Sequence, residues 1–265
     1  MKKKIAALSM AACMAASATA CGGSKPAETT AAATEAETTA AESAAEESSA
    51  EETKAAADIE TVTPGKLTVA TSPDFAPYEF YAIGEDGTPK LAGFDMDLAQ
   101  YIADYLGLEL EVVTVDFDGV ISELQTKSVD LGMAGLSPDE KRMGIMDFSD
   151  LYYMGGQSLV TVKDNAEKYN SFEAINKPDV SVGAQVGSIQ MDLANENSPE
   201  ADIVGLPKVT DIISELLTGK MDAAYIETDV AKSYQKNYPE LTLVMDVPYD
   251  AEGSAIGVCK GNEAL

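Results

Sequence analysis

The sequence contains no histidine, no tryptophan and a single arginine among its 265 residues. Without histidine, the chain cannot build a Ser-His-Asp triad, a Cys-His pair or an imidazole-ligated metal site. Basic residues are also scarce, since 18 Lys plus Arg stand against 45 Asp plus Glu, for a net charge of −27. Proteins that bind polyanions hold phosphates through Lys and Arg, so we expect no nucleic-acid partner. No pattern in the sequence requires a cofactor or a metal.

Cysteine is scarce as well, and two of the three cysteines lie within residues 1–21. Lys2, Lys3 and Lys4 precede an apolar, alanine-rich stretch that is too short for a membrane span and is typical of a secretory signal. Small residues before Cys21 and Gly-Gly-Ser after it resemble a bacterial lipoprotein cleavage site. The alternative is an ordinary signal peptide with an incidental cysteine. We predict a leader that ends at a lipidated Cys21, with lipid as the only membrane anchor, on the extracellular face of the cell membrane or in the periplasm.

Residues 22–63 are dominated by Ala, Glu, Thr and Ser and have almost no bulky apolar side chains. Such a composition cannot bury enough apolar surface to fold, and its acidic excess makes the segment self-repelling. We therefore predict a disordered tether between the leader and a body that begins at residue 64. The body keeps one cysteine, Cys259, so no structural disulfide is available to it.

From residue 64 onward, short β-rich runs alternate with helical patterns. The expected strands are 67–70, 109–115, 129–134, 180–184, 203–206, 223–226 and 241–246, and the clearest helices are 98–106 and 120–125. This alternation predicts an α/β fold with mainly parallel sheets flanked by helices. Asp95 or Asp97 is expected to cap the first helix. The buried face of that helix would comprise Leu98, Ile102, Tyr105 and Leu106.

The body also repeats itself. Residues 121–126 are Ile-Ser-Glu-Leu-Gln-Thr, residues 213–218 are Ile-Ser-Glu-Leu-Leu-Thr, and an aspartate follows each segment at the same spacing. Convergence on a common helix–strand pattern is one explanation, but four consecutive identities favour two halves of one design. Two α/β halves without a long linker predict a cleft between them. Ligands of open α/β sheets bind beyond the carboxyl ends of the strands, so the residues that follow each strand are the candidates for a site.

Aromatic side chains follow the first two strands. Phe75 comes after the strand at 67–70, and Phe117 comes after the strand at 109–115. Each phenylalanine alone is more typical of a hydrophobic core. As a pair at neighbouring strand ends, however, they could sandwich the side chain of a ligand.

The only arginine lies after the third strand. Ser137, Pro138 and Glu140 predict a capping box with proline at the first helical position. Arg142 would then lie near a helix start that favours an anion. Arg142 could form a surface ion pair, or it could bind a carboxylate through two parallel hydrogen bonds. We favour the carboxylate because the chain uses lysine everywhere else.

The second half offers two further candidates. Ser188 follows the strand at 180–184 and begins a helix whose N-terminus could hold an anion. Glu227 follows the strand at 223–226 and could bind an ammonium group, although Thr228 or Asp229 could also simply cap the next helix. An arginine for a carboxylate, an acid for an ammonium group and aromatic rings for a side chain are together what a free α-amino acid needs.

Residues 66–260 resemble the bacterial extracellular solute-binding proteins of family 3, the polar amino-acid receptors of ABC importers. The segments that carry the resemblance are 67–71, 75–80 (Phe-Ala-Pro-Tyr-Glu-Phe), 93–98 (Gly-Phe-Asp-Met-Asp-Leu), 116–119, 135–142 and 147–153. The resemblance implies a two-lobed periplasmic-binding-protein-like fold with the ligand between the lobes. Lobe 1 would be formed by 64–154 and 249–265, and lobe 2 by 155–248, with crossings near 154–157 and 247–250.

The same resemblance implies three groups of ligand-binding residues. The α-carboxylate would be held by Arg142 and by the backbone N–H groups of Ser188 and Ile189. The α-ammonium group would be held by the Gly135 carbonyl, the Ser137 hydroxyl and Glu227. The side chain of the ligand would contact Phe75 and Phe117, with Ser72 and Gln185 nearby as specificity positions.

These residues imply a monomeric receptor that takes up a free polar or cationic L-amino acid and delivers it to an ABC permease. Two other functions remain open. The fold also hosts dehydratases and lyases, for which Glu227 and Asp229 could act as acid and base. A sensor ectodomain would need a membrane span and a signalling domain after the body. We expect a binding protein and no enzyme. Family members continue past the position of Leu265 with a helix that returns to lobe 1, so we also expect a C-terminally truncated lobe 1 with an exposed apolar groove.

Overall fold

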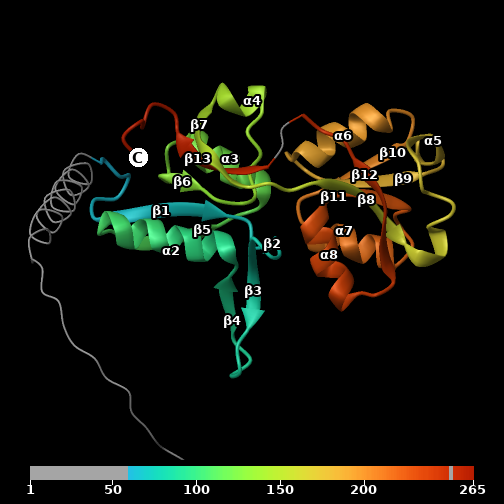
Figure 1. Ribbon diagram of the computed structural model, residues 1–265, viewed down its shortest axis with the longest axis horizontal. Helices are drawn as coiled ribbons and strands as arrows, with labels where there is room; N and C mark the ends of the chain where they lie inside the picture. Colours follow the sequence, from blue (N-terminus) through green and yellow to red (C-terminus); the bar gives the residue numbers. More distant parts are fainter. Residues whose placement is uncertain (1–58, 251–252) are drawn as a thin grey trace, which may run out of the picture. The chain divides into compact units, whose positions relative to one another are not determined.

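The computed structural model describes residues 59–250 and 253–265, which all lie within one compact unit of the chain (Figure 1). The predicted leader, the predicted lipidation site Cys21 and most of the predicted tether lie outside the described residues. Within the described ranges, no helix is both long and apolar enough to cross a membrane. Val62, at the end of the predicted tether, already contacts the body, because its backbone N–H donates to Asp130 Oδ1 at 2.7 Å.

The first of two five-stranded sheets has the strand order β5-β1-β6-β13-β7. Its strands are β1 (Lys66–Thr71), β5 (Glu109–Thr114), β6 (Leu131–Gly132), β7 (Met146–Tyr153) and β13 (Ser254–Cys259). Only β13 runs against its neighbours, so the other four strands share one direction. Helices α2 (Phe94–Leu106) and α3 (Phe117–Gln125) cover opposite faces: Leu67 of β1 packs in one core cluster with Ala103 of α2, and Ala70 packs in another with Val120 of α3.

The second sheet repeats this arrangement strand for strand. Its order is β10-β9-β11-β8-β12, formed by β8 (Gln157–Val162), β9 (Ser181–Gln185), β10 (Asp202–Leu206), β11 (Ala223–Glu227) and β12 (Leu241–Val247). Here β8 is the strand that runs against its neighbours. Its flanking helices are η1 (Lys163–Asn165), α5 (Phe172–Ile175), α6 (Ile189–Asn197), α7 (Val209–Leu217) and α8 (Thr228–Asn237). The two sheets confirm the predicted fold class, in which mainly parallel sheets are flanked by helices.

The repeated sequence occupies equivalent places in the two halves. Helices α3 and α7 contain the two copies, and each precedes a central strand of its sheet, β6 or β11. The Oδ2 atom of Asp130 accepts a hydrogen bond from Thr68 N at 2.8 Å, and that of Asp222 accepts one from Ser181 N at 3.0 Å. Thr68 and Ser181 lie on β1 and β9, which are equivalent strands. This agreement in hydrogen bonding favours two halves of one design over chance convergence.

The chain passes between the two sheets twice. It leaves the first sheet after β7 and enters the second at β8, and it returns between β12 and β13. We call the elements before the first passage, together with β13, lobe 1, and the elements between the two passages lobe 2. Lobe 1 also contains a small antiparallel sheet of β2 (Asp74–Phe75), β3 (Glu79–Ile83) and β4 (Pro89–Ala92).

Several predicted element bounds were wrong. Helix α2 begins at Phe94, and its N-cap is Gly93 rather than Asp95 or Asp97. Gly93 has a φ of 125°, and a Cβ at this position would lie 2.0 Å from the Tyr78 carbonyl oxygen, so only glycine fits there. Asp95 is buried in the first turn, whereas Tyr105, predicted to be buried, is exposed. Helix α3 begins at Phe117, three residues earlier than predicted, and β6 has only two residues.

The predicted capping box was also wrong. The short helix α4 (Glu140–Met143) has Asp139 as its N-cap, and the Asp139 carboxylate accepts a hydrogen bond from Arg142 N at 2.8 Å. Ser137 and Pro138 lie before the helix. A carboxylate is a stronger acceptor than a hydroxyl, and this one lies closer to the helix start. The Ser137 hydroxyl is therefore not needed as a cap.

Candidate functional site

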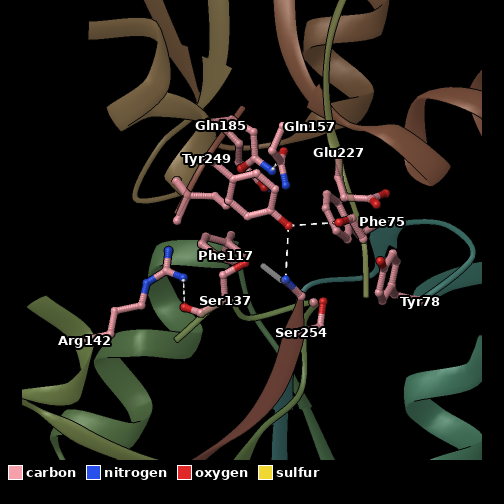
Figure 2. A pocket seen from close by; sticks show the side chains of 15 residues that line it. Phe75, Tyr78, Phe117, Ser137, Arg142, Gln157, Gln185, Glu227, Tyr249 and Ser254 are labelled. Carbon is pink, nitrogen blue, oxygen red and sulfur yellow. Dashed lines mark hydrogen bonds between the residues drawn. The ribbon is translucent and has the colours of Figure 1, made fainter. Parts of the chain in front are cut away.

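A narrow hollow lies between the two lobes, with room for about one water molecule. Figure 2 shows the side chains that line it. The lining residues are Phe75, Tyr78, Phe117, Gly135, Ser137, Arg142, Gly155, Gln157, Gln185, Ile189, Gln190, Glu227, Tyr249, Gly253 and Ser254. Eight of the ten predicted ligand-binding residues are among them. A ligand as large as an amino acid can enter only after the lobes or the side chains move apart.

Arg142 is buried at the wall of the hollow. Its Nη1 donates to the Ser137 carbonyl at 2.8 Å, its Nη2 donates to the Gly187 carbonyl of lobe 2 at 3.0 Å, and its Nε lies 3.2 Å from Asp139 Oδ2. These contacts account for three of the five guanidinium N–H groups. One N–H on each terminal nitrogen is left, which is the fork that a carboxylate accepts. Burial lowers the pKa of Arg142, but the guanidinium stays charged at neutral pH.

The two predicted phenylalanines both reach the hollow. Phe117 is the first residue of α3, and its ring centre lies 5.5 Å from the Arg142 Cζ, within cation–π range. Phe75 is the second residue of the short strand β2. Gly135, with a φ of 57°, lies so close to the Phe75 ring that a Cβ there would come within 2.8 Å of it. Glycine at this position therefore lets the aromatic ring approach the backbone.

Glu227 ends strand β11 and serves as the N-cap of α8. Its Oε2 accepts from Val230 N at 2.7 Å, so the structure combines the capping and the site alternatives in one residue. Its Oε1 is buried and has no hydrogen-bond partner among the described residues, and the same holds for Tyr78 Oη. Both atoms face Gly155, where a Cβ would lie 2.8 Å from Glu227 Oε1 and 3.2 Å from Tyr78 Oη. Burial raises the pKa of Glu227 to about 7. An unpartnered buried oxygen favours a donor such as an ammonium group.

The remaining predicted residues fall into two groups. Ser137, Gln185 and Ile189 line the hollow, and Ile189 is the first residue of α6, where backbone N–H groups have no intrahelical acceptor. Ser188 does not line it: Ser188 caps α6, and its own N–H donates to the Gln185 carbonyl at 3.3 Å. Ser72 does not line it either.

Ser72 faces a separate and wider hollow at the edge of the lobes, together with Asp74, Thr114, Asp116 and Lys208. Its hydroxyl donates to Asp74 Oδ1 at 3.0 Å. Because Ser72 lines this second hollow and not the Arg142 hollow, it is a weaker candidate for ligand contact than the resemblance implied.

Sequence reasoning missed several lining residues that lie at the passages between lobes. Gln157 is the first residue of β8 and accepts from Gln190 Nε2 at 2.7 Å. The Tyr249 ring lies across the middle of the view in Figure 2; its hydroxyl donates to the Gly155 carbonyl and accepts from Gly253 N, both at 3.1 Å. Tyr249 thus joins the two passages. The predicted crossings near 154–157 and 247–250 were the only signal that could have pointed to these residues.

Two carboxyl groups lie buried behind the hollow. Asp95 Oδ2 accepts from Gly135 N at 3.3 Å and from the Tyr152 hydroxyl at 3.0 Å, which connects it to the site. Glu79 is fully buried, and neither of its side-chain oxygens has a partner among the described residues. Burial raises the pKa of Asp95 to about 6, and burial together with the nearby Asp95 charge raises that of Glu79 well above its usual range.

We expect Asp95→Asn to flatten the pH dependence of stability. Because the pKa of Asp95 rises from 3.8 to about 6 on folding, stability should fall as pH rises through that window. The full effect is about 3 kcal/mol, at about 1.4 kcal/mol per pKa unit. Asparagine keeps an oxygen for Gly135 N and Tyr152 and carries no charge to bury. Urea unfolding of both proteins from pH 4 to 7 gives the difference curve. A pH-independent difference would contradict the assignment.

Residues 67–264 match the sequence profile of the bacterial extracellular solute-binding proteins, family 3. The match spans the whole two-lobed body, including both passages. The chain belongs to this family. The predictions of family and of a solute-binding protein are therefore confirmed, and the family description places such proteins outside the cytoplasm.

Two binding proteins and one enzyme are among the individual relatives of this family-3 protein. The arginine-binding extracellular protein ArtP of Bacillus subtilis (strain 168) is 35% identical over 202 residues, covering 75% of this chain and 76% of the relative. The crystal structure of the amino acid ABC transporter substrate-binding protein AbpA from Streptococcus pneumoniae Canada MDR_19A bound to L-arginine has a TM-score of 0.72 and 34% identity, covering 76% and 85%. Cyclohexadienyl dehydratase of Pseudomonas aeruginosa is 29% identical, covering 68% and 66%. The binding proteins favour a receptor over an enzyme.

Proposed function

We propose that this protein binds a free L-amino acid, with L-arginine as the first candidate, in the hollow between its lobes and delivers it to an ABC permease. The observation that carries the proposal is that one hollow is lined both by Arg142 and by Glu227, whose Oε1 has no hydrogen-bond partner among the described residues. The first is a charged donor for a carboxylate, and the second is an acceptor for an ammonium group. Two relatives whose names or structures specify arginine support the choice of ligand.

The α-amino and α-carboxyl groups of the ligand would each have complementary partners in the hollow. The two remaining N–H groups of Arg142 and the N–H of Ile189 at the start of α6 would hold the carboxylate. Glu227 Oε1, the Ser137 hydroxyl and the Gly135 carbonyl would accept the three ammonium hydrogens. The N–H of Ser188 is already used within its own turn, so we leave it out of the proposed contacts.

The side chain of the ligand would lie between the Phe75 and Phe117 rings. Aromatic faces attract a planar guanidinium by cation–π interaction, at about 0.5–2 kcal/mol. The net charge of −27 also raises the local concentration of a cationic solute. Gln157 and Gln185 at the lobe 2 side of the hollow offer amide oxygens as further hydrogen-bond acceptors.

We infer no catalytic step at this site. The dehydratase relative shows that this family's neighbours include an enzyme. Glu227 is engaged as a helix cap, and Asp229 is paired with the Tyr153 hydroxyl and with Lys232, which lies 3.0 Å away. Neither arrangement resembles an acid and a base aimed at one reacting atom. Prolonged incubation with a bound ligand, followed by mass spectrometry, would reveal a product if an enzyme is present.

The remaining proposals concern the location of the protein and its partners. A lipidated Cys21 would tether a monomeric receptor to the outer face of the cell membrane, next to its permease. Treatment of intact cells with palmitate analogues, followed by detection on the purified protein, tests the lipid. Cys21→Ser should abolish the label and release the protein into the medium.

A thermal-shift panel of the twenty L-amino acids tests the proposed function. A ligand at 100 times its dissociation constant stabilises the folded state by about 2.7 kcal/mol, which is easily measured. We expect L-arginine to give the largest shift and D-arginine to give none. A shift with another amino acid would keep the receptor and change the ligand. No shift with any amino acid would reject the proposal.

A further inference from the structure

Asp74 of lobe 1 contacts lobe 2 through both its side chain and its backbone. Its Oδ2 accepts a hydrogen bond from Val209 N at the start of α7, across 135 residues of sequence. Its carbonyl oxygen accepts from the Tyr234 hydroxyl of α8 at 2.7 Å, and its Oδ1 accepts from Ser72 Oγ at 3.0 Å. Asp74 is nearly fully buried. It therefore lies in the seam between the lobes and not on the ligand hollow.

Helix α7 has no cap of its own. Its N-cap residue is Lys208, whose side chain makes no capping hydrogen bond. The first N–H groups of a helix need acceptors, and a carboxylate there also interacts favourably with the helix dipole. Asp74 supplies that carboxylate from the other lobe. A carboxylate that completes a helix in another lobe can do so only while the lobes are together.

The residues that pack around Asp74 also come from both lobes. Phe75 and Tyr78, the neighbours of Asp74 in lobe 1, pack in the same core cluster as Val209 and Ile212 of α7. Phe75 and Tyr78 also line the ligand hollow. Any separation of the lobes therefore breaks the cap, uncovers this apolar cluster and opens the ligand site in one movement.

We propose that Asp74 is a positioning residue that latches the closed lobes by capping α7, and so sets how long a ligand stays bound. The proposal rests on the proposed receptor function but concerns a residue that makes no ligand contact. A latch of this kind acts only on the closed state. Its loss should therefore speed ligand release and should not slow ligand entry, which also requires the lobes to separate.

The direct test is the dissociation rate of radiolabelled L-arginine from the full chain. Hydrogen bonds to charged groups are strong, so we expect Asp74→Ala to raise the dissociation rate about tenfold or more, with an association rate no lower than that of wild type. Asp74→Asn keeps an acceptor oxygen and should recover part of the effect. Asp116→Asn is the matched control: Asp116 also faces lobe 2, where Lys208 Nζ lies 3.7 Å away, but both side chains are exposed, so we expect little change.

A second variant removes the donor of this hydrogen bond, the Val209 N–H. Val209 is the first residue of α7, a position that proline favours, and Lys208 before it is extended (φ −124°, ψ 138°), as a residue before proline should be. Val209→Pro therefore deletes the N–H and keeps the helix start, while Val209→Ala keeps the N–H and controls for lost packing. A latch predicts that Val209→Pro adds almost nothing in the Asp74→Ala background. Full additivity of the two changes would overturn the proposal.

A ligand-free measurement separates the latch from the proposed ligand. We expect hydrogen exchange at the Val209 amide to quicken about tenfold in Asp74→Ala, with the amides of β9 unchanged, because the Asp74 carboxylate is the acceptor of the Val209 N–H among the described residues. Unchanged exchange at Val209 would overturn the latch even if L-arginine binds as proposed. If wild type binds no L-arginine, the exchange experiment still decides the latch, and only the ligand assignment fails.

Discussion

Arg142→Ala should weaken L-arginine binding by about 100- to 1,000-fold, since truncation of one partner of a buried, hydrogen-bonded charge pair costs about 2–5 kcal/mol. The ligand carboxylate would lose both N–H groups of the guanidinium fork and would remain buried against Phe117 without a countercharge. Stability should fall much less, because two of the lost contacts are hydrogen bonds to carbonyls and the third partner, Asp139, keeps its capping role. Isothermal titration calorimetry on folded protein, checked by circular dichroism, measures the change.

Arg142→Lys is the informative control for this prediction. Lysine keeps the positive charge but presents it at a single atom, so it cannot make two parallel hydrogen bonds to one carboxylate. We expect affinity between those of wild type and the alanine variant. Binding of the lysine variant as tight as wild type would show that charge alone is needed and that the fork is not used. Unchanged binding in the alanine variant would remove Arg142 from the site.

The prediction that Arg142 belongs to a ligand site was based on its rarity and its position together. One arginine in a lysine-using chain, placed after a predicted strand, indicated a role that needs a planar fork. The structure places Arg142 at the hollow, although the helix start predicted there was wrong. The Ser-x-x-Glu pattern matched a capping box, but Asp139 competes for the same N–H groups, and no sequence rule decides which acceptor folds closer to them.

Residues that depend on side-chain direction were harder to predict. Ser72 and Phe75 both follow β1, yet the chain turns between them so that only Phe75 reaches the Arg142 hollow. Tyr249 lies in the passage between β12 and β13, where no strand or helix period exists to indicate which way a side chain points, and Gln157 begins β8, a strand that we did not predict. The mainly parallel sheets and the repeated halves were accessible from the sequence because they follow from periodicity and strand–helix alternation.

Affinity for L-arginine should rise with pH up to about pH 7 and then level off. Burial raises the pKa of Glu227 to about 7, so below that pH the ligand-free protein holds a neutral carboxyl that must release its proton before it can pair with an ammonium group. The dissociation constant should therefore increase about tenfold for each pH unit below pH 7, or about 100-fold from pH 8 to pH 5. Calorimetry in buffers of different ionisation enthalpy should detect about half a proton released per ligand at pH 7.

Glu227→Gln provides the matched variant. The glutamine oxygen can still accept from Val230 N, so α8 keeps its cap. Affinity should drop at pH 8 because the countercharge is gone, and its dependence on pH between 5 and 8 should disappear. A glutamine variant that retains the wild-type pH profile would place the titrating group elsewhere.

The stability of the ligand-free protein should increase as the pH falls, whereas its affinity for the ligand should decrease. Acid unfolding is therefore excluded as the cause of weak binding at low pH. The pKa of Glu227 rises from 4.5 to about 7 on folding, so the folded state holds a proton that the unfolded chain has released. The contribution of Glu227 to the stability of the folded state is therefore fully present below about pH 4.5 and is lost as the pH rises through about 7. Acidification from pH 7 to pH 5 should leave the empty protein more stable while it loses its ligand. Higher stability together with weaker binding at low pH is expected only if one buried carboxyl resists ionisation in the empty hollow and must ionise to hold an ammonium group.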